Sequence, residues 1–455
     1  MYKGERSKIV NMKRYFFLLV LACVVAGCQF RQDEWVDFTD VTAAKDLTFQ
    51  VIGQRETDLG EGLPYDCFMP DGTRVSEWLE EEAQSAEDGP LHMPATSSVT
   101  GAGILQELLK YGNQKTVIEI AGIYPSLDSD GNPVILSGKV MLPKGQRPKR
   151  MILVSHYTVC SNKEAPSNCF SLEGVLVKLG YGLIIPDYLG YGITAQEVHP
   201  YLVMDLTARH VVDMYQAVRP WLEAVGYVPD DPKLDLMGYS QGGATTMAVE
   251  HLIETEYSDS GRLNYIKLHR VYAGGGPYDV KATYERFVTT DIAGYPVAVP
   301  LVLQGMIVGN KLNIAMNDLM QDWLYNKMDE WINSKRFTSA QINQLINTKV
   351  THDILTEEGM NQTSDKVAEL YKAMTQNSIT SYNWTPGSSV YIMHSIDDET
   401  VPFTNASNAK SRWKDANITY NFGHYGGHVK TCLRFIYSVQ TLIIQEEEER
   451  KKYEQ

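Results

Sequence analysis

The sequence predicts an α/β fold built on a mostly parallel central sheet flanked by helices. Six short apolar runs recur along the 455-residue chain, with helical stretches between them. Runs that are apolar almost throughout and alternate with helices are typical of parallel strands buried on both faces. Between two of them, residues 202–222 place apolar side chains at spacings of three and four, as an amphipathic helix requires. The predicted strands are residues 151–154, 183–185, 234–237, 271–273, 390–393 and 418–420.

An antiparallel pair precedes these strands. Residues 124–134 read as strand, turn and strand with the turn at Asp130-Gly131, and residues 134–143 continue as the partner. Upstream, residues 29–100 are polar and irregular. The long segment 274–387 carries helical runs between two strands, and an insertion of this size normally covers the catalytic edge. We therefore expect a cap; the alternative is a peripheral helical decoration.

The predicted organisation has five parts. They are a signal peptide (1–27), a lipidated tether with an N-terminal extension (28–114), an α/β core (115–273 and 388–445), a helical cap (274–387) and a charged C-terminal tail (446–455).

The N-terminus resembles a bacterial lipoprotein signal peptide. A basic stretch at 12–14 precedes an apolar run at 15–25 and small residues directly before Cys28. In this lipobox pattern Cys28 becomes the acylated first residue of the mature chain. A transmembrane anchor is the alternative, but an apolar run of about a dozen residues is too short to span a bilayer. Gln29 is compatible with sorting to an outer membrane, and either face of that membrane stays open.

The charge of the chain excludes one class of partner. The formal net charge is −15, and removal of residues 1–27 makes the mature chain more acidic still. We therefore expect the protein not to bind nucleic acid. We also expect it not to attach to a membrane through a basic surface helix. The lipid on Cys28 remains the expected means of membrane attachment.

A serine stands at a sharp turn between a predicted strand and a predicted helix. Gly238-Tyr239-Ser240-Gln241-Gly242 follows the run at 234–237 and precedes a helical stretch. Glycines on both sides allow the strained backbone that exposes the Ser240 hydroxyl above the sheet. The Gln241 amide at the helix start is then free to bind developing negative charge. The motif predicts a nucleophilic serine, which needs a base and an orienting acid downstream.

The acid candidates follow the strand at 390–393. This stretch resembles the α/β-hydrolase pattern, in which an aspartate stands three residues before Val-Pro, and that register selects Asp398. Asp397 is the competitor and Glu399 a weaker one.

Two histidines compete for the role of base. His428 stands beside glycines at a helix start, the usual position of the hydrolase base, whereas His424 lies nearer the strand end. We predict His428, with His424 as a hydrogen-bonding or solvent-facing residue.

The second oxyanion donor should come from the loop after the strand at 151–154. In this loop His156 stands where hydrolases carry a His-Gly-x motif, and Tyr157 replaces the usual glycine. The resemblance implies the Thr158 amide as donor, with Tyr157 as second choice and His156 as a brace.

The mature chain retains four cysteines besides the acylated one. Cys160 and Cys169 lie nine apart, which permits a local disulfide in an oxidising envelope, against two inert thiols. Cys67 and Cys432 could pair or stay free. No clustered His/Cys pattern indicates a metal site.

The region 115–445 carries a nucleophile, an acid, a base and an oxyanion loop, and it resembles an α/β-hydrolase. Within that superfamily it resembles the bacterial lipoprotein esterases and the secretory-lipase-like proteins. The resemblance implies a serine esterase that forms an acyl-enzyme, without metal or organic cofactor. Alternatives are a prolyl-oligopeptidase-type serine peptidase without a propeller, a polysaccharide acetyl or feruloyl esterase, and a non-catalytic binding protein. Oligomeric state is left open.

Overall fold

The computed structural model describes residues 35–36, 38, 48–87, 100–261 and 264–453. The predicted signal peptide and Cys28 lie outside these residues. Within the described part, no helix is long and apolar enough to cross a membrane.

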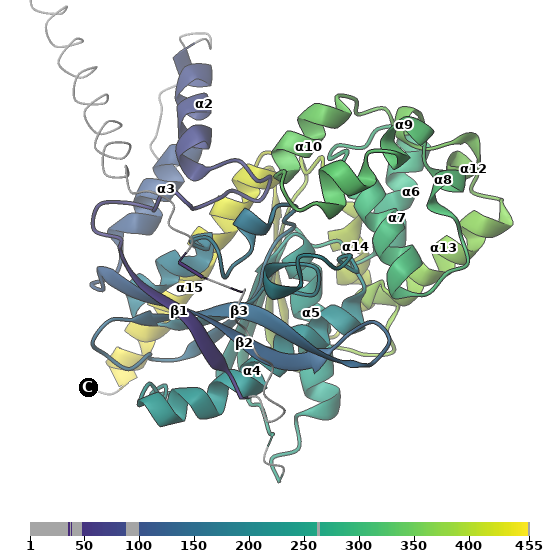
Figure 1. Ribbon diagram of the computed structural model, residues 1–455. Coiled ribbons are helices and arrows are strands. Elements are labelled where there is room, and N and C mark those ends of the chain that lie inside the picture. The colour runs from purple at the N-terminus through teal and green to yellow at the C-terminus, as the bar shows by residue number, and fades with distance from the viewer. Residues whose placement is uncertain (1–34, 37, 39–47, 88–99, 262–263, 454–455) are drawn as a thin grey trace, which may run out of the picture.

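A nine-stranded sheet forms the centre of the molecule, in the order β1-β2-β3-β5-β4-β6-β7-β8-β9 (Figure 1). Its first three strands and the β3–β5 pair are antiparallel, and every pair from β5–β4 to β8–β9 is parallel. The predicted α/β class is therefore confirmed. The strands are β1 (Gln50–Asp58), β2 (Thr116–Leu127), β3 (Pro133–Pro143), β4 (Met151–Ser155), β5 (Gly182–Pro186), β6 (Leu234–Tyr239), β7 (Leu268–Gly274), β8 (Ser389–Ser395) and β9 (Ile418–Gly423).

Helices cover both faces of this sheet and give it two hydrophobic cores. On one face, α4 (Met204–Val225) and α5 (Gln241–Glu256) pack together and continue into the apolar interior of the segment between β7 and β8. On the other face, α15 (His428–Tyr453) packs beside α3 (Gly101–Lys110), with η2 (Leu172–Leu179) in the same core. The central parallel strands β4, β5 and β6 are therefore buried on both faces, as parallel strands require.

Between β7 and β8 the chain forms only short helices, which gather to one side of the sheet in Figure 1. Their apolar side chains join the α4/α5 core, so this segment shares its packing with the sheet. The elements are α6 (Val280–Thr290), α7 (Ala298–Gly309), α8 (Met316–Leu319), α9 (Asp322–Tyr325), η4 (Asp329–Asn333), α10 (Ser339–Ile346), α11 (Thr351–Ile354), α12 (Glu357–Met360), α13 (Asp365–Gln376) and η5 (Ile379–Ser381).

The N-terminal extension is more regular than the sequence indicated. Strand β1 adds to the edge of the sheet beside β2, and α2 (Val75–Glu87) and α3 follow it. A buried ion-pair network fixes β1: Glu119 accepts from Arg55 Nε at 2.9 Å and from Lys139 Nζ at 2.8 Å. Glu119 and Lys139 are both fully buried, so each charge depends on the other.

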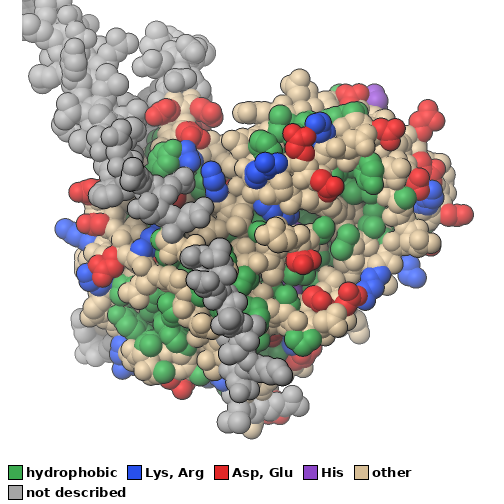
Figure 2. All heavy atoms as spheres, in the orientation of Figure 1, with side chains coloured by type: hydrophobic (Ala, Val, Ile, Leu, Met, Phe, Trp, Pro, Cys, Tyr) green, Lys and Arg blue, Asp and Glu red, His purple; other side chains and the backbone are tan. Residues whose placement is uncertain are grey.

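The C-terminal residues belong to a long helix. Residues 446–453, expected as a charged tail, are the last turns of α15. Two of the acidic residues are paired: Glu446 contacts His269 Nε2 at 3.0 Å and Arg150 at 3.4 Å, and Glu447 contacts Lys149 Nζ at 2.6 Å. On the face drawn in Figure 2, acidic and basic side chains are likewise intermixed rather than gathered by sign.

Candidate active site

Ser240 lies at the turn from β6 into α5 in a conformation that few side chains tolerate. Its backbone angles are φ 58° and ψ −126°. The turn is possible because two glycines flank it: a Cβ at Gly238 would collide with the Gly242 carbonyl, and one at Gly242 would collide with the Ser155 carbonyl of β4. The close packing of β4, β6 and α5 therefore holds the hydroxyl at the carboxyl edge of the sheet.

The three predicted residues are hydrogen-bonded in series. Ser240 Oγ lies 2.8 Å from His428 Nε2, and His428 Nδ1 lies 2.6 Å from Asp398 Oδ2. Since a carboxylate only accepts, the Nδ1–H of His428 donates to Asp398, and Nε2 is free to accept the serine proton. Asp398 follows β8, and His428 is the first residue of α15, so neighbouring strand ends bring them to Ser240.

The surroundings of Asp398 keep it ionised. Burial acts to raise the pKa of Asp398, but the His428 imidazole and hydrogen bonds outweigh it and hold the pKa below its ordinary value. The amides of Thr400 and Val401 donate to Asp398 Oδ1 at 2.9 and 2.8 Å. His394 lies 3.8 Å away, and burial lowers its pKa, which favours its neutral form.

The competing acid and base pair with each other instead. Asp397 Oδ1 lies 2.7 Å from His424 Nδ1, and both side chains are exposed. Neither therefore joins the buried series at Ser240. Glu399, the third acid, lines the cavity beside Ser240.

The two oxyanion candidates lie in different segments of the chain. Gln241 begins α5, and Thr158 lies in the loop after β4 and lines the cavity with Ser240. In the described part of the chain neither backbone amide donates to a protein acceptor. The Tyr157 hydroxyl donates to the Phe68 carbonyl at 2.7 Å, so its side chain ties the loop to the segment before α2. Thr158 Oγ1 bonds the Tyr201 hydroxyl at 2.8 Å.

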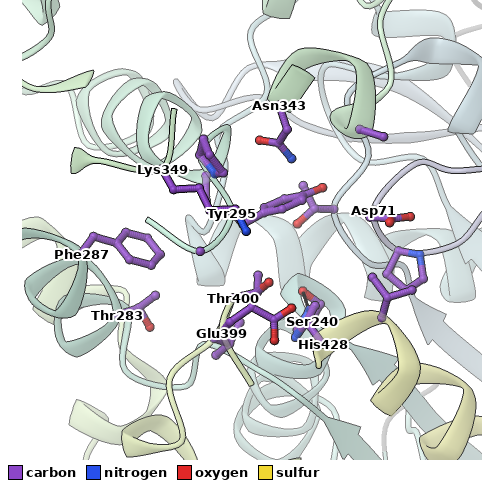
Figure 3. Close-up of a pocket in the computed structure, with 18 of the residues that line it drawn as sticks. Asp71, Ser240, Thr283, Phe287, Tyr295, Asn343, Lys349, Glu399, Thr400 and His428 are labelled. Carbon is purple, nitrogen blue, oxygen red and sulfur yellow. Dashed lines mark hydrogen bonds between the residues drawn. The ribbon is translucent and has the colours of Figure 1, made fainter. Parts of the chain in front are cut away.

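A cavity of about 570 Å³ opens above Ser240 and His428 (Figure 3). Three separate parts of the chain wall it: the loop before α2, the helices between β7 and β8, and the strand ends. Sequence reasoning missed most of the polar side chains in its wall, because no motif marks them. They include Asp71, Thr283, Asn343, Gln344 and Lys349.

Of the two alternatives for Cys160 and Cys169, a local disulfide or two inert thiols, the structure has the thiols. Both side chains are free, buried thiols, as are Cys67 and Cys432. The Cys169 thiol donates to the Glu164 carbonyl at 3.3 Å, whereas Cys160 packs into the core on the α4/α5 side. A spacing of nine residues would allow the two thiols to meet, but they are buried in different surroundings and do not form a bond. Among the described residues, no group of His, Cys, Asp and Glu side chains could hold a metal ion.

The fold and the serine turn define a class of protein, an α/β-hydrolase of the serine hydrolase kind. The chain belongs to the secretory lipase family, whose sequence profile matches residues 167–435, more than half of its length. This membership makes it a carboxylic ester hydrolase.

A second profile, that of the prokaryotic membrane lipoprotein lipid attachment site, matches residues 12–29. It indicates a lipid-anchored protein of the bacterial envelope.

Two solved structures illustrate the shared fold. The rice cell wall degrading esterase LipA from Xanthomonas oryzae has a TM-score of 0.63 and 21% identity, over 75% of this chain and 93% of that chain. Candida antarctica lipase A has a TM-score of 0.50 and 18% identity, over 69% of this chain and 73% of that chain. No curated protein matches the sequence.

Proposed function

We propose that the protein is a serine esterase in which Ser240 is the nucleophile, His428 the general base and Asp398 the orienting acid. The observation that carries the proposal is the hydrogen-bonded series of these three side chains, with distances of 2.8 and 2.6 Å, at the floor of the cavity. A base within hydrogen-bond reach of a serine, itself oriented by a carboxylate, is what activation of a hydroxyl requires.

The reaction proceeds in two halves. His428 Nε2 takes the Ser240 proton while Oγ bonds to the ester carbonyl carbon, and the negative oxygen accepts from the amides of Gln241 and Thr158. The imidazolium, stabilised by Asp398, then returns the proton to the departing alcohol as the ester C–O bond breaks. Water attacks the acyl-enzyme with His428 as base, which releases the acid and frees Ser240.

The cavity wall favours esters with a polar alcohol part. Charged and amide side chains face it from several directions, including Asp71, Asn343, Lys349 and Glu399, while Phe287 supplies apolar wall at another end (Figure 3). A long acyl chain would need a continuous apolar wall, since burying these polar groups against hydrocarbon without partners is costly. We expect short acyl chains to be cleaved faster than long ones.

A second candidate function is the hydrolysis of acyl esters on a cell-wall polysaccharide. The same polar wall supports it, since hydroxyl-rich substrates supply hydrogen-bond partners for carboxylate and amide groups. The relative LipA is described as a cell wall degrading esterase, which agrees with this reading.

We further propose that Cys28 carries the lipid and that Gln29 directs the protein to the outer membrane. The lipid attachment profile, which spans both positions, supports the first part. A chain with Cys28→Ser, followed by membrane fractionation, tests it: the protein should move to the soluble fraction.

Covalent labelling tests the enzyme proposal. A fluorophosphonate probe should label the wild type and Ser258→Ala, a control at an exposed serine, but leave Ser240→Ala unlabelled. The same three proteins should be compared on p-nitrophenyl esters of increasing chain length. Labelling that persists in Ser240→Ala would refute the assignment of the nucleophile, and absence of turnover at every length would refute the esterase.

A further inference from the structure

Lys335 brings a cation into the interior of the protein beside the loop that carries Thr158. It follows η4 and is only 4% exposed. Its backbone adopts φ 55°, a region that lysine rarely occupies. Its carbonyl oxygen accepts from the Asn162 amide at 2.8 Å. This bond joins the helices between β7 and β8 to the end of the 156–162 loop.

The Lys335 ammonium lies over an aromatic ring behind this loop. It is 4.8 Å from the centroid of the Tyr191 ring. Tyr191 packs with Tyr157, Val159 and Ala165 in a small buried cluster, and its hydroxyl donates to the Val159 carbonyl. The Lys335 ammonium therefore contacts the buried cluster that supports the 156–162 loop.

His199 extends this arrangement to Gln241. Its ring lies 5.1 Å from that of Tyr191, its Nδ1 donates to the Leu189 carbonyl at 2.8 Å, and its Nε2 accepts from the Gln241 side chain at 2.9 Å. Burial and then the charge of Lys335 lower the pKa of His199 well below its ordinary value, which keeps Nε2 an acceptor. The charge of Lys335 therefore acts on His199, the residue that is hydrogen-bonded to the Gln241 side chain.

The charge of Lys335 lacks an acidic partner. Across the described residues no carboxylate forms an ion pair with it, and burial lowers its pKa to about 8 against the opposing effect of Cys160. A buried ammonium without a carboxylate is unfavourable for folding. Because Lys335 lies behind the loop that carries Thr158, its charge is a candidate for a role in the reaction.

We propose that Lys335 is a positioning residue of the esterase reaction, whose buried charge behind the 156–162 loop stabilises the negative carbonyl oxygen held by the Gln241 and Thr158 amides. The inference rests on the proposed function, since it needs an oxyanion formed at Ser240. A fixed charge acts further through a protein interior than through water. Because the carbonyl oxygen gains its charge only in the transition state, loss of the Lys335 charge should lower kcat and leave KM nearly unchanged.

Other titratable groups face the Lys335 site and must be separated from it. Burial raises the pKa of the Cys160 thiol and of the Tyr191 hydroxyl well above their ordinary values. Glu164, in η1 (Asn162–Glu164), is the exception, because burial raises its pKa to about 8, the range of Lys335 itself. Glu164→Gln is therefore the matched control.

The experiment is a profile of kcat against pH with p-nitrophenyl acetate, corrected with Ser240→Ala. Wild-type kcat should fall across pH 8 to a lower plateau, by a factor on the order of three to ten. Lys335→Met should lie on the lower plateau throughout. Lys335→Arg should stay on the upper one, because a guanidinium keeps its proton. Glu164→Gln should fall as the wild type does.

Two outcomes would overturn the inference. One is a kcat of Lys335→Met equal to that of the wild type below pH 8; the other is a fall across pH 8 that disappears in Glu164→Gln. If Lys335→Met does not fold, the wild type and Lys335→Arg still decide, since equal falls in both would exclude Lys335. Either result leaves the esterase proposal standing as long as Ser240→Ala is inactive and the wild type turns over.

Discussion

Asp397 Oδ1 and His424 Nδ1 lie 2.7 Å apart at the surface, while Asp398 Oδ2 and His428 Nδ1 lie 2.6 Å apart in the interior. Two adjacent carboxylates thus select two histidines four positions apart, one pair exposed and one buried. The buried pair is the one that reaches Ser240.

The two pairs make a matched comparison possible. Asp398→Asn should lower kcat by about three to four orders of magnitude, because the amide can no longer fix the His428 tautomer. Asp397→Asn should keep kcat within about twofold, since an exposed pair contributes little. Steady-state kinetics on one p-nitrophenyl ester measures both. Equal losses in the two variants would contradict the assignment.

Gly242→Ala should abolish hydrolysis and destabilise the fold. The added methyl group would strike the Ser155 backbone, which cannot move without distorting β4. We expect a loss of about 2 kcal/mol or more in the free energy of unfolding, measured by urea denaturation. Gly261→Ala is the control and should behave as wild type, since among the described residues the new Cβ meets the Asp259 side chain alone, at ordinary contact distance.

Glu119→Gln should cost about 3–5 kcal/mol of stability, because it leaves Lys139 buried without its anion. Glu56→Gln, which removes an exposed pair with Lys144 on the same sheet, should cost less than about 1 kcal/mol. Urea unfolding of both variants at neutral pH makes the comparison. Similar losses of unfolding free energy in the two variants would show that burial does not increase the contribution of the Glu119–Lys139 pair to stability.

The same glutamate makes a pH prediction. Burial acts to raise the pKa of Glu119, but Lys139 and Arg55 outweigh it and lower the pKa. The folded state therefore holds the ionised form more strongly than the unfolded chain, so this stabilisation is present at neutral pH. It should be lost as pH falls below the ordinary carboxyl range. The stability difference between wild type and Glu119→Gln should accordingly shrink on acidification.

The four buried cysteines should resist thiol reagents in the folded protein. Burial raises the pKa of the Cys160 and Cys169 thiols well above the ordinary value, so little thiolate exists to react. Alkylation followed by mass spectrometry should find none of the four modified before denaturation and all four after it. If Cys160 and Cys169 were alkylated in the denatured protein only after a reductant is added, the two residues would form a disulfide and the prediction would be wrong.

The residues predicted from sequence are those whose position follows from local order along the chain. Ser240 directly follows β6, Asp398 lies in the loop after β8, and His428 begins the helix after β9, so the sheet brings them together once the strands are parallel. Asn343 and Lys349 carry no such signal, because they reach the cavity only through packing of segments that are distant in sequence. Strand β1 was missed for a related reason: its polar residues gave no apolar run, and its place depends on the partner that β2 supplies.

His428 is the first residue of α15, the last helix of the chain, and Ser240 precedes it by 188 positions. A ribosome therefore completes the nucleophile long before it completes the base. Until α15 has been synthesised, the Ser240 hydroxyl has no His428 imidazole beside it. Assembly of the site therefore waits for the final helix to pack against the sheet.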